Sequence, residues 1–126
     1  MLVKSVADSL KGATEDDTAK NISTWVHDNI KYERAYANLD TYSTLKCYYD
    51  TINTHKTICK GQAMMINELT AMNGLTSRIG IGTANGGAHA WATIFLNNIP
   101  YDVDVTSEYI LFLPHKYNTF QLEYYI

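Results

Sequence analysis

The N-terminal half of the chain repeats its hydrophobic residues every three or four positions, the spacing of one face of a helix. This pattern predicts a short helix over residues 2–10 and a longer amphipathic helix over 15–30. Thr14 and Asp17 resemble a capping box and mark the start of the longer helix. Its repeating hydrophobic positions are Ala19, Ile22, Val26 and Ile30, with Trp25 beside them.

Two further helices are predicted between the longer helix and the middle of the chain. One is expected over residues 41–53, with Asp40 as its cap. Its inward positions are expected to be Leu45, Ile52 and one of Tyr48 and Tyr49.

The helix over 59–73 has a clearer pattern, because hydrophobic residues surround most of its circumference. Such a helix is usually buried on several sides. Gly74 follows it, at the position where a residue in the left-handed conformation often ends a helix. The hydrophobic positions are Ala63, Met64, Met65, Ile66, Leu69 and Met72.

After Gly74 the hydrophobic period changes to two, which is the period of a β-strand. A glycine-rich loop at 84–88 separates the first two expected strands. Helices first and an antiparallel sheet afterwards indicate an α+β fold, and the length suits one domain over 1–126. The expected strands are 75–83, 89–96, 99–105, 108–114 and 118–126.

A tight turn at Asn97 and Asn98 would set the register of the second and third strands, because asparagine tolerates left-handed angles. This register collects apolar residues on one face, and a slip of one residue would turn them outward. It puts His89 and Asp104 on the other face as diagonal neighbours, with backbones about 7–8 Å apart. The paired residues are Leu96 with Ile99, Ile94 with Tyr101, Ala92 with Val103 and Ala90 with Val105, and the other face also carries Trp91 and Asp102.

These positions suggest a nucleophilic site. Cys59 lies at the predicted start of the buried helix, where unpaired N–H groups and the helix dipole stabilise a thiolate. In this interpretation Cys59 attacks, His89 transfers the proton, and Asp104 orients the ring. Each residue also has a structural interpretation: a small buried cysteine, a hydrogen-bonded surface histidine, and an aspartate that caps a turn.

Composition and charge argue against several other classes of protein. The chain is 46% hydrophobic and 18% charged, with a net charge of −3 and no run of Lys or Arg, which disfavours nucleic acid or anionic membrane as partners. No apolar stretch reaches the roughly 18–20 residues that span a bilayer. The N-terminus lacks the pattern of a signal peptide, so a cytoplasmic location is the default expectation. A piece of a secreted or surface protein is the alternative.

The chain has two cysteines, Cys47 and Cys59. They are too few for a disulfide scaffold or for a zinc site built on CxxC pairs. One alternative joins them as a disulfide, which would remove the nucleophile. Another makes Cys59, His89 and an acid metal ligands, although no paired spacing favours it. The acyl-transfer chemistry needs no cofactor, and no cluster suited to calcium is evident.

Four segments together resemble the transglutaminase-like superfamily in its small bacterial form: CKGQA at 59–63, NGLTSRIGIG at 73–82, HAW at 89–91 and PYDVDVT at 100–106. The segment TAKNISTWVHDNIKYE at 18–33 also resembles the helix that precedes the core in that family. The resemblance covers about 18–113 and implies a papain-like fold with a catalytic triad of Cys59, His89 and Asp104.

The chain departs from the family pattern beside the triad, at Gln62, Ala92 and Val105. These departures bear on substrate and rate. The resemblance also implies a second oxyanion donor upstream of the cysteine, for which Tyr48, Tyr49 and His55 are all candidates.

Three functions remain open at this point. The first is a cysteine peptidase or amidase that hydrolyses an amide of a protein or peptide through a thioester. The second is a protein-glutamine γ-glutamyltransferase that cross-links glutamine side chains to amines. The third is a binding module with the fold and no turnover. The substrate and the oligomeric state are left undetermined.

Overall fold

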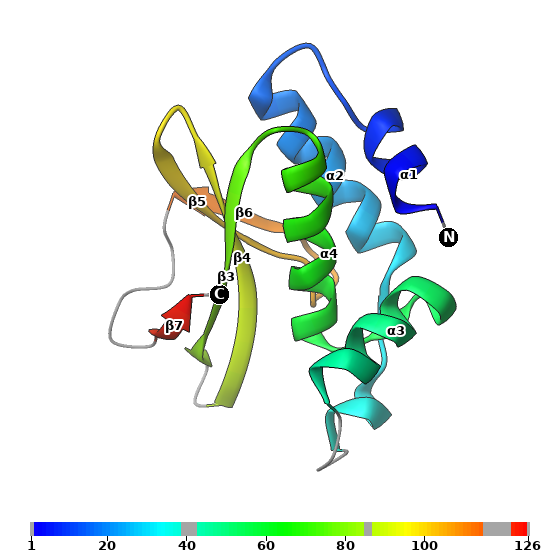
Figure 1. The fold of residues 1–126 in the computed structure, drawn as a ribbon. Helices are drawn as coiled ribbons and strands as arrows, with labels where there is room; N and C mark the ends of the chain where they lie inside the picture. The colour runs from blue at the N-terminus through cyan, green and yellow to red at the C-terminus, as the bar shows by residue number, and fades with distance from the viewer. Residues whose placement is uncertain (1, 39–42, 85–86, 115–121, 126) are drawn as a thin grey trace.

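Helices and strands are segregated along the chain, as the sequence predicts for an α+β fold, and Figure 1 shows the helices packed against one face of the sheet. The computed structural model describes residues 2–38, 43–84, 87–114 and 122–125.

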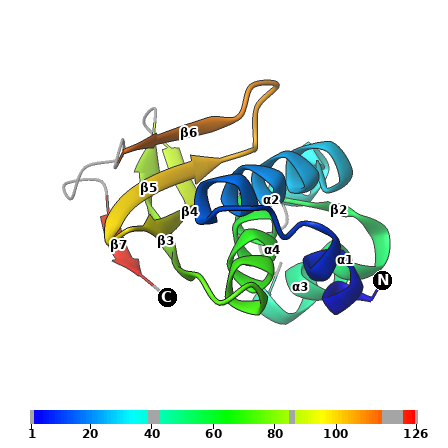
Figure 2. The ribbon, with the colours of Figure 1, turned by 90° about the horizontal axis from the view of Figure 1, so that it is seen from above.

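Helix α4 lies between the sheet and helices α1 and α3. Figure 2, seen from above, shows α2 and α4 near the sheet and α1 and α3 farther from it. Helices α1, α2 and α3 all contact α4, which in turn contacts β3 (Thr76–Ala84) and β4 (Gly87–Leu96). The helices are α1 (Val3–Ser9), α2 (Glu15–Asn29), α3 (Thr44–Thr54) and α4 (Cys59–Met72), and a 3-10 helix spans Arg34–Asn38.

The main sheet is antiparallel and has the strand order β6-β5-β4-β3-β7. A separate parallel pair, β1-β2, lies beside the helices. The predicted loop at 84–88 and the predicted strand over 118–126 fall partly outside the described residues. The strands are β1 (Lys31–Tyr32), β2 (Lys56–Thr57), β3 (Thr76–Ala84), β4 (Gly87–Leu96), β5 (Ile99–Asp104), β6 (Leu111–Pro114) and β7 (Leu122–Tyr125).

The ends of the helices follow local side-chain chemistry. Thr14 caps α2 as predicted, because its hydroxyl accepts a hydrogen bond of 3.1 Å from the backbone N–H of Asp17. Ser43 caps α3 in the same way, with the N–H of Lys46 at 3.1 Å. The predicted cap of α3, Asp40, lies outside the described residues. Gly74 has a φ of 76°, the left-handed conformation expected there.

The predicted inward face of α3 is partly wrong. Leu45 is 79% exposed, whereas Cys47 and Thr51 are buried against the rest of the protein. Residues two apart on a helix lie about 200° apart around its axis, so burial of Cys47 turns Leu45 outward. Of the two tyrosine candidates, Tyr48 is half-buried and Tyr49 is 60% exposed. Ile52 packs against the core as predicted.

The core forms where α4 and α2 meet the sheet. The repeating hydrophobic positions predicted for α2 are buried. Most of the apolar positions of α4 are also buried, but Met72 is 46% exposed and Met64 is half-buried. The core residues of these elements are Ala19, Ile22 and Val26 of α2, Ala63, Met65, Ile66 and Leu69 of α4, and Ile79, Ala92, Ile94 and Val103 of the sheet.

The hairpin between β4 and β5 has the predicted turn and register. Asn97 and Asn98 have φ values of 52° and 65°, which suits a two-residue turn. The ladder ends at Ala92 and Val103, one predicted pair short of Ala90 and Val105. Its pairs include Leu96 with Ile99, Ile94 with Tyr101, and Ala92 with Val103.

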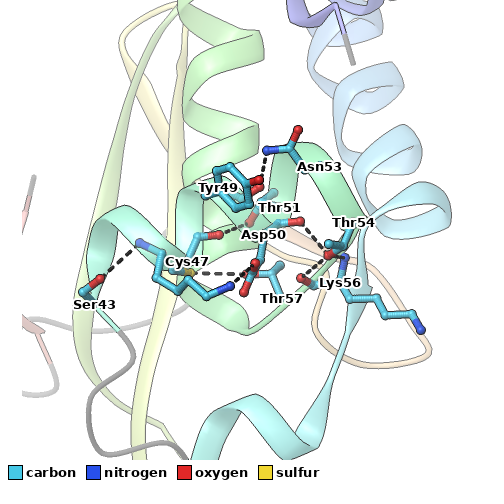
Figure 3. A network of polar contacts seen from close by, with 10 residues as sticks. Ser43, Cys47, Tyr49, Asp50, Thr51, Asn53, Thr54, Lys56 and Thr57 are labelled. Carbon is cyan, nitrogen blue, oxygen red and sulfur yellow. Dashed lines mark hydrogen bonds and ion pairs between the residues drawn. The ribbon is translucent and has the colours of Figure 1, made fainter.

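The contact between α3 and α4 depends on Gly61. The hydroxyl of Thr51 donates to the carbonyl of Cys47 at 2.8 Å, and Thr57 lies 3.2 Å from the sulfur of Cys47 (Figure 3). A Cβ atom on Gly61 would clash with the hydroxyl oxygens of both threonines, which are fully buried. Glycine therefore allows the last turns of α3 and the strand β2 to approach the first turn of α4.

We expect Gly61→Ala to destabilise the protein by about 1–3 kcal/mol, because the added methyl group overpacks a buried contact. Urea denaturation followed by circular dichroism would measure this change. Lys20→Ala, at an exposed position of α2, is the control and should change stability by less than about 0.5 kcal/mol. Equal stability of Gly61→Ala and the unmodified protein would contradict this account of the α3–α4 contact.

Candidate active site

His89 of β4 and Asp104, the last residue of β5, meet across the sheet. Nε2 of His89 lies 2.5 Å from Oδ2 of Asp104. Their side chains are only 17% and 10% exposed, so the pair is largely shielded from water. The strand register thus brings the predicted histidine and the predicted acid into contact. Nδ1 is left as the ring nitrogen facing away from the carboxylate.

Thr106 holds the other oxygen of the carboxylate. Its backbone N–H and its hydroxyl both donate to Oδ1 of Asp104, at 3.1 and 2.8 Å. Each oxygen of Asp104 therefore has a separate partner, which fixes the plane of the carboxylate relative to the His89 ring. No sequence pattern indicates this role for Thr106, although the residue belongs to the segment PYDVDVT.

Cys59 is the first residue of α4 and is half-buried. The N-cap position before it is Ile58, whose side chain makes no capping hydrogen bond, in contrast to Thr14 of α2 and Ser43 of α3. The N–H groups in the first turn of a helix have no partner within the helix. The backbone around the sulfur therefore presents donors and the positive end of the helix dipole.

The electrostatics of the site centre on His89. Burial disfavours the charged ring and lowers its pKa. Hydrogen bonds from the ring to Asp104 and to Cys59, together with the negative charges of both, outweigh that effect. Together, these opposing effects raise the pKa of His89 from 6.5 to about 10. The ring is therefore an imidazolium at neutral pH, in contact with both the carboxylate and the sulfur.

Three hollows lie near the first turn of α4. A narrow hollow is lined by Cys59, Asp104, Gln62 and Thr106, among others. A larger cavity of about 360 Å³ is also lined by Gln62 and Thr106, and by Tyr32. On the other side of the first turn of α4, a hollow of about 410 Å³ lies between α3, α4 and β3. It is lined by Tyr48, Lys60, Met64, Asn67, Glu68 and Ile79, among others.

The candidate oxyanion donors differ in their surroundings. The hydroxyl of Tyr48 donates to Glu68 at 2.6 Å, and burial and that carboxylate raise the pKa of Tyr48 to about 12. Tyr49 is 60% exposed. His55 packs edge-on against Trp25, with ring centroids 6.4 Å apart. Tyr32, which no sequence pattern singles out, borders the cavity beside the narrow hollow of Cys59.

The alternative sites proposed from the sequence are not formed. Cys47 and Cys59 are both free thiols, so the disulfide alternative is wrong, and Cys47 is buried with its sulfur near Thr57. Within the described part of the chain, no group of three or more His, Cys, Asp or Glu side chains could hold a metal ion. No described helix is long and apolar enough to cross a membrane.

The chain matches the family model described as a transglutaminase-like domain over residues 2–123, and it therefore belongs to that family. None of the curated proteins matches it significantly.

Solved structures share the fold at low sequence identity. One is a crystal structure of a TGase, with a TM-score of 0.67 and 21% identity over 84% of this chain. A candidate cysteine protease from Cytophaga hutchinsonii has a TM-score of 0.67 and 15% sequence identity over 89% of this chain. A candidate protease from Parabacteroides distasonis has a TM-score of 0.56 and 10% sequence identity, also over 89% of this chain. This chain spans 30%, 40% and 27% of their respective lengths. The likeness confirms the transglutaminase-like, papain-like fold.

The raised pKa of His89 predicts how stability depends on pH. The folded protein keeps the ring proton up to about pH 10, whereas the unfolded chain releases it near pH 6.5. The stabilisation is therefore fully present below pH 6.5 and is lost as the pH rises towards 10. Melting temperatures of the unmodified protein and of His89→Gln, measured from pH 6 to 10, should converge as the pH increases. A constant difference over that range would contradict the assignment.

Proposed function

We propose that this transglutaminase-like domain is a cysteine-dependent acyl-transfer enzyme that hydrolyses an amide bond of a protein or peptide through a thioester. The observation that carries the proposal is the contact of His89 with Asp104 on one side and with Cys59, at the uncapped start of α4, on the other. A buried imidazolium beside a sulfur is the arrangement that activates a thiolate.

In the first step the sulfur of Cys59 attacks the carbonyl carbon of the amide. A C–S bond forms and the π electrons of the carbonyl move to its oxygen. The backbone N–H of Cys59 is suited to stabilise that oxyanion, because it lies in the first turn of α4. When the C=O bond re-forms, the C–N bond breaks, and His89 gives its proton to the leaving nitrogen.

In the second step the neutral His89 removes a proton from a water molecule, whose oxygen attacks the thioester. The thiolate leaves and the acid product is released, so the resting charges return. An amine in place of water would give a new amide. Asp104 keeps the ring oriented through both steps, and Thr106 keeps Asp104 in place.

Transfer of a glutamine acyl group to an amine is the second candidate function. The shared fold with a TGase supports it, while the candidate proteases of the same fold support hydrolysis. The reaction of a glutamine-containing protein with a fluorescent amine separates the two. Incorporated label indicates transfer, and ammonia or peptide release without label indicates hydrolysis. Protein treated with iodoacetamide is the control. No reaction, together with an unreactive Cys59, would leave a binding module and overturn the enzymatic proposal.

Cys59→Ala should abolish turnover with little loss of stability, because the side chain is half-buried and supplies the attacking atom. Cys47→Ala is the matched control, since Cys47 is a buried thiol that lines neither of the hollows beside Cys59 and Tyr32. We expect Cys47→Ala to lower the melting temperature and to retain activity. Turnover and thermal melts of both variants would test this, and an active Cys59→Ala variant would refute the mechanism.

Asp104→Asn should lower kcat by up to about 10⁴-fold, because an amide cannot hold the ring in its productive tautomer or stabilise its charge. The chain offers a second contact of this type for comparison, since His27 and Asp28 lie 2.9 Å apart on α2. Asp28→Asn should leave kcat unchanged. Comparable losses in the two variants would show that the effect is not specific to the proposed site.

A further inference from the structure

We propose that the hydroxyl of Tyr32 donates a second hydrogen bond to the oxyanion that forms when Cys59 attacks a carbonyl. This inference rests on the proposed function, because it assigns a further catalytic residue to the same reaction. The backbone N–H of Cys59 supplies one donor, and a tetrahedral oxyanion is stabilised further by another donor aimed at the same oxygen.

The backbone holds Tyr32 close to the start of α4. Tyr32 in β1 pairs in parallel with Thr57 in β2, which is two residues before Cys59. The N–H of Lys31 donates to the carbonyl of His55 at 2.8 Å, and the N–H of Glu33 donates to the carbonyl of Thr57 at 2.7 Å. These two bonds flank Tyr32. The position of its Cα relative to the first turn of α4 is therefore fixed by main-chain contacts.

The side chain of Tyr32 borders the space in which the reaction would take place. Tyr32 lines the 360 Å³ cavity together with Gln62 and Thr106. The same two residues line the narrow hollow that contains Cys59 and Asp104. Tyr32 and Cys59 therefore border two hollows that share Gln62 and Thr106 as lining residues. Because Tyr32 is still 38% exposed, a substrate carbonyl can reach it from solvent.

The hydroxyl of Tyr32 is available as a donor. With the described residues it makes no hydrogen bond, whereas the hydroxyl of Tyr48 is already used by Glu68. Burial raises the pKa of Tyr32, and negative charge on Cys59 raises it further, although Arg34 acts in the opposite direction. Tyr32 therefore remains protonated at the pH of the reaction. It also senses charge at the position of the attacking sulfur.

The role is electrostatic and leaves the phenol proton on its oxygen. As the C–S bond forms, the carbonyl π pair becomes the oxyanion, and the O–H of Tyr32 hydrogen-bonds to it. When the C=O bond re-forms and the leaving group departs, that hydrogen bond weakens again. The hydroxyl therefore favours the tetrahedral species over the ground state, which is the condition for an effect on rate.

The test compares two reactions of Cys59, of which only one forms an oxyanion. Acylation by p-nitrophenyl acetate passes through a tetrahedral oxyanion, whereas alkylation by iodoacetamide is a direct displacement at carbon. We expect Tyr32→Phe to slow acylation about 100-fold, as for loss of one oxyanion donor, and to leave alkylation unchanged. Tyr48→Phe, which removes the hydroxyl of the competing tyrosine, should leave both rates unchanged. Circular dichroism and the alkylation rate verify that each variant is folded with an intact thiol.

The outcomes distinguish this inference from the function on which it rests. If Tyr32→Phe acylates at the rate of the unmodified protein, the role of Tyr32 is refuted and the cysteine mechanism stands. If both reactions slow equally, the hydroxyl acts on the thiolate and the inference is also wrong. A selective loss of acylation in Tyr48→Phe would assign the donor to that residue instead. An unmodified protein whose Cys59 reacts with neither reagent would overturn both proposals.

Discussion

The burial of α4 against the sheet and against the other helices is the contact on which the other features of the structure depend. Side chains of α4 such as Ile66 and Leu69 are almost completely buried, and each such side chain contributes about 1.5–3 kcal/mol. This packing fixes both the axis and the rotation of α4. It therefore also fixes where the first residue of that helix, Cys59, lies relative to His89 near the start of β4.

The same packing compensates for an unfavourable helix start. A capping side chain is worth about 1 kcal/mol, and α4 has none, whereas α2 and α3 each have one. The helix begins at Cys59 because its apolar face is held by tertiary contacts. The backbone N–H groups that a capping side chain would bind therefore remain available to an anion beside the sulfur. In the proposed mechanism, that anion is first the thiolate and then the oxyanion.

Polar contacts connect the separate segments that surround the sulfur. Thr106 orients Asp104, Asp104 orients His89, and the charged ring faces Cys59. On the other side, Gly61 lets Thr57 approach α4, and Thr57 in β2 positions Tyr32 in β1. The site is thus built from three parts of the chain: a hairpin, a helix start and a short parallel strand pair. The contact at Gly61 joins the helix start to the strand pair, and the contact of His89 with Cys59 joins the hairpin to the helix start.

The sequence alone determined the features that depend on local periodicity. It predicted the order of helices and strands, the cap of α2, and the register of the hairpin that brings Asp104 to His89. That prediction succeeds because a two-residue turn and a buried face leave only one alignment of the two strands. Cys59 was predicted to belong to the candidate site because it lies at a predicted helix start and because of the family resemblance. The number of residues between Cys59 and His89 does not by itself indicate how close they are in space.

Only the tertiary structure decided how elements that are distant in sequence meet. Periodicity shows which residues of a helix share a face, but the face that is buried depends on the surface of the partner. For α3 this surface is the close contact at Gly61, which turns Cys47 and Thr51 inward and leaves Leu45 exposed. The hydrogen bonds of Thr106 to Asp104, and the position of Tyr32 at the 360 Å³ cavity, likewise arise from packing between segments. No local pattern specifies them.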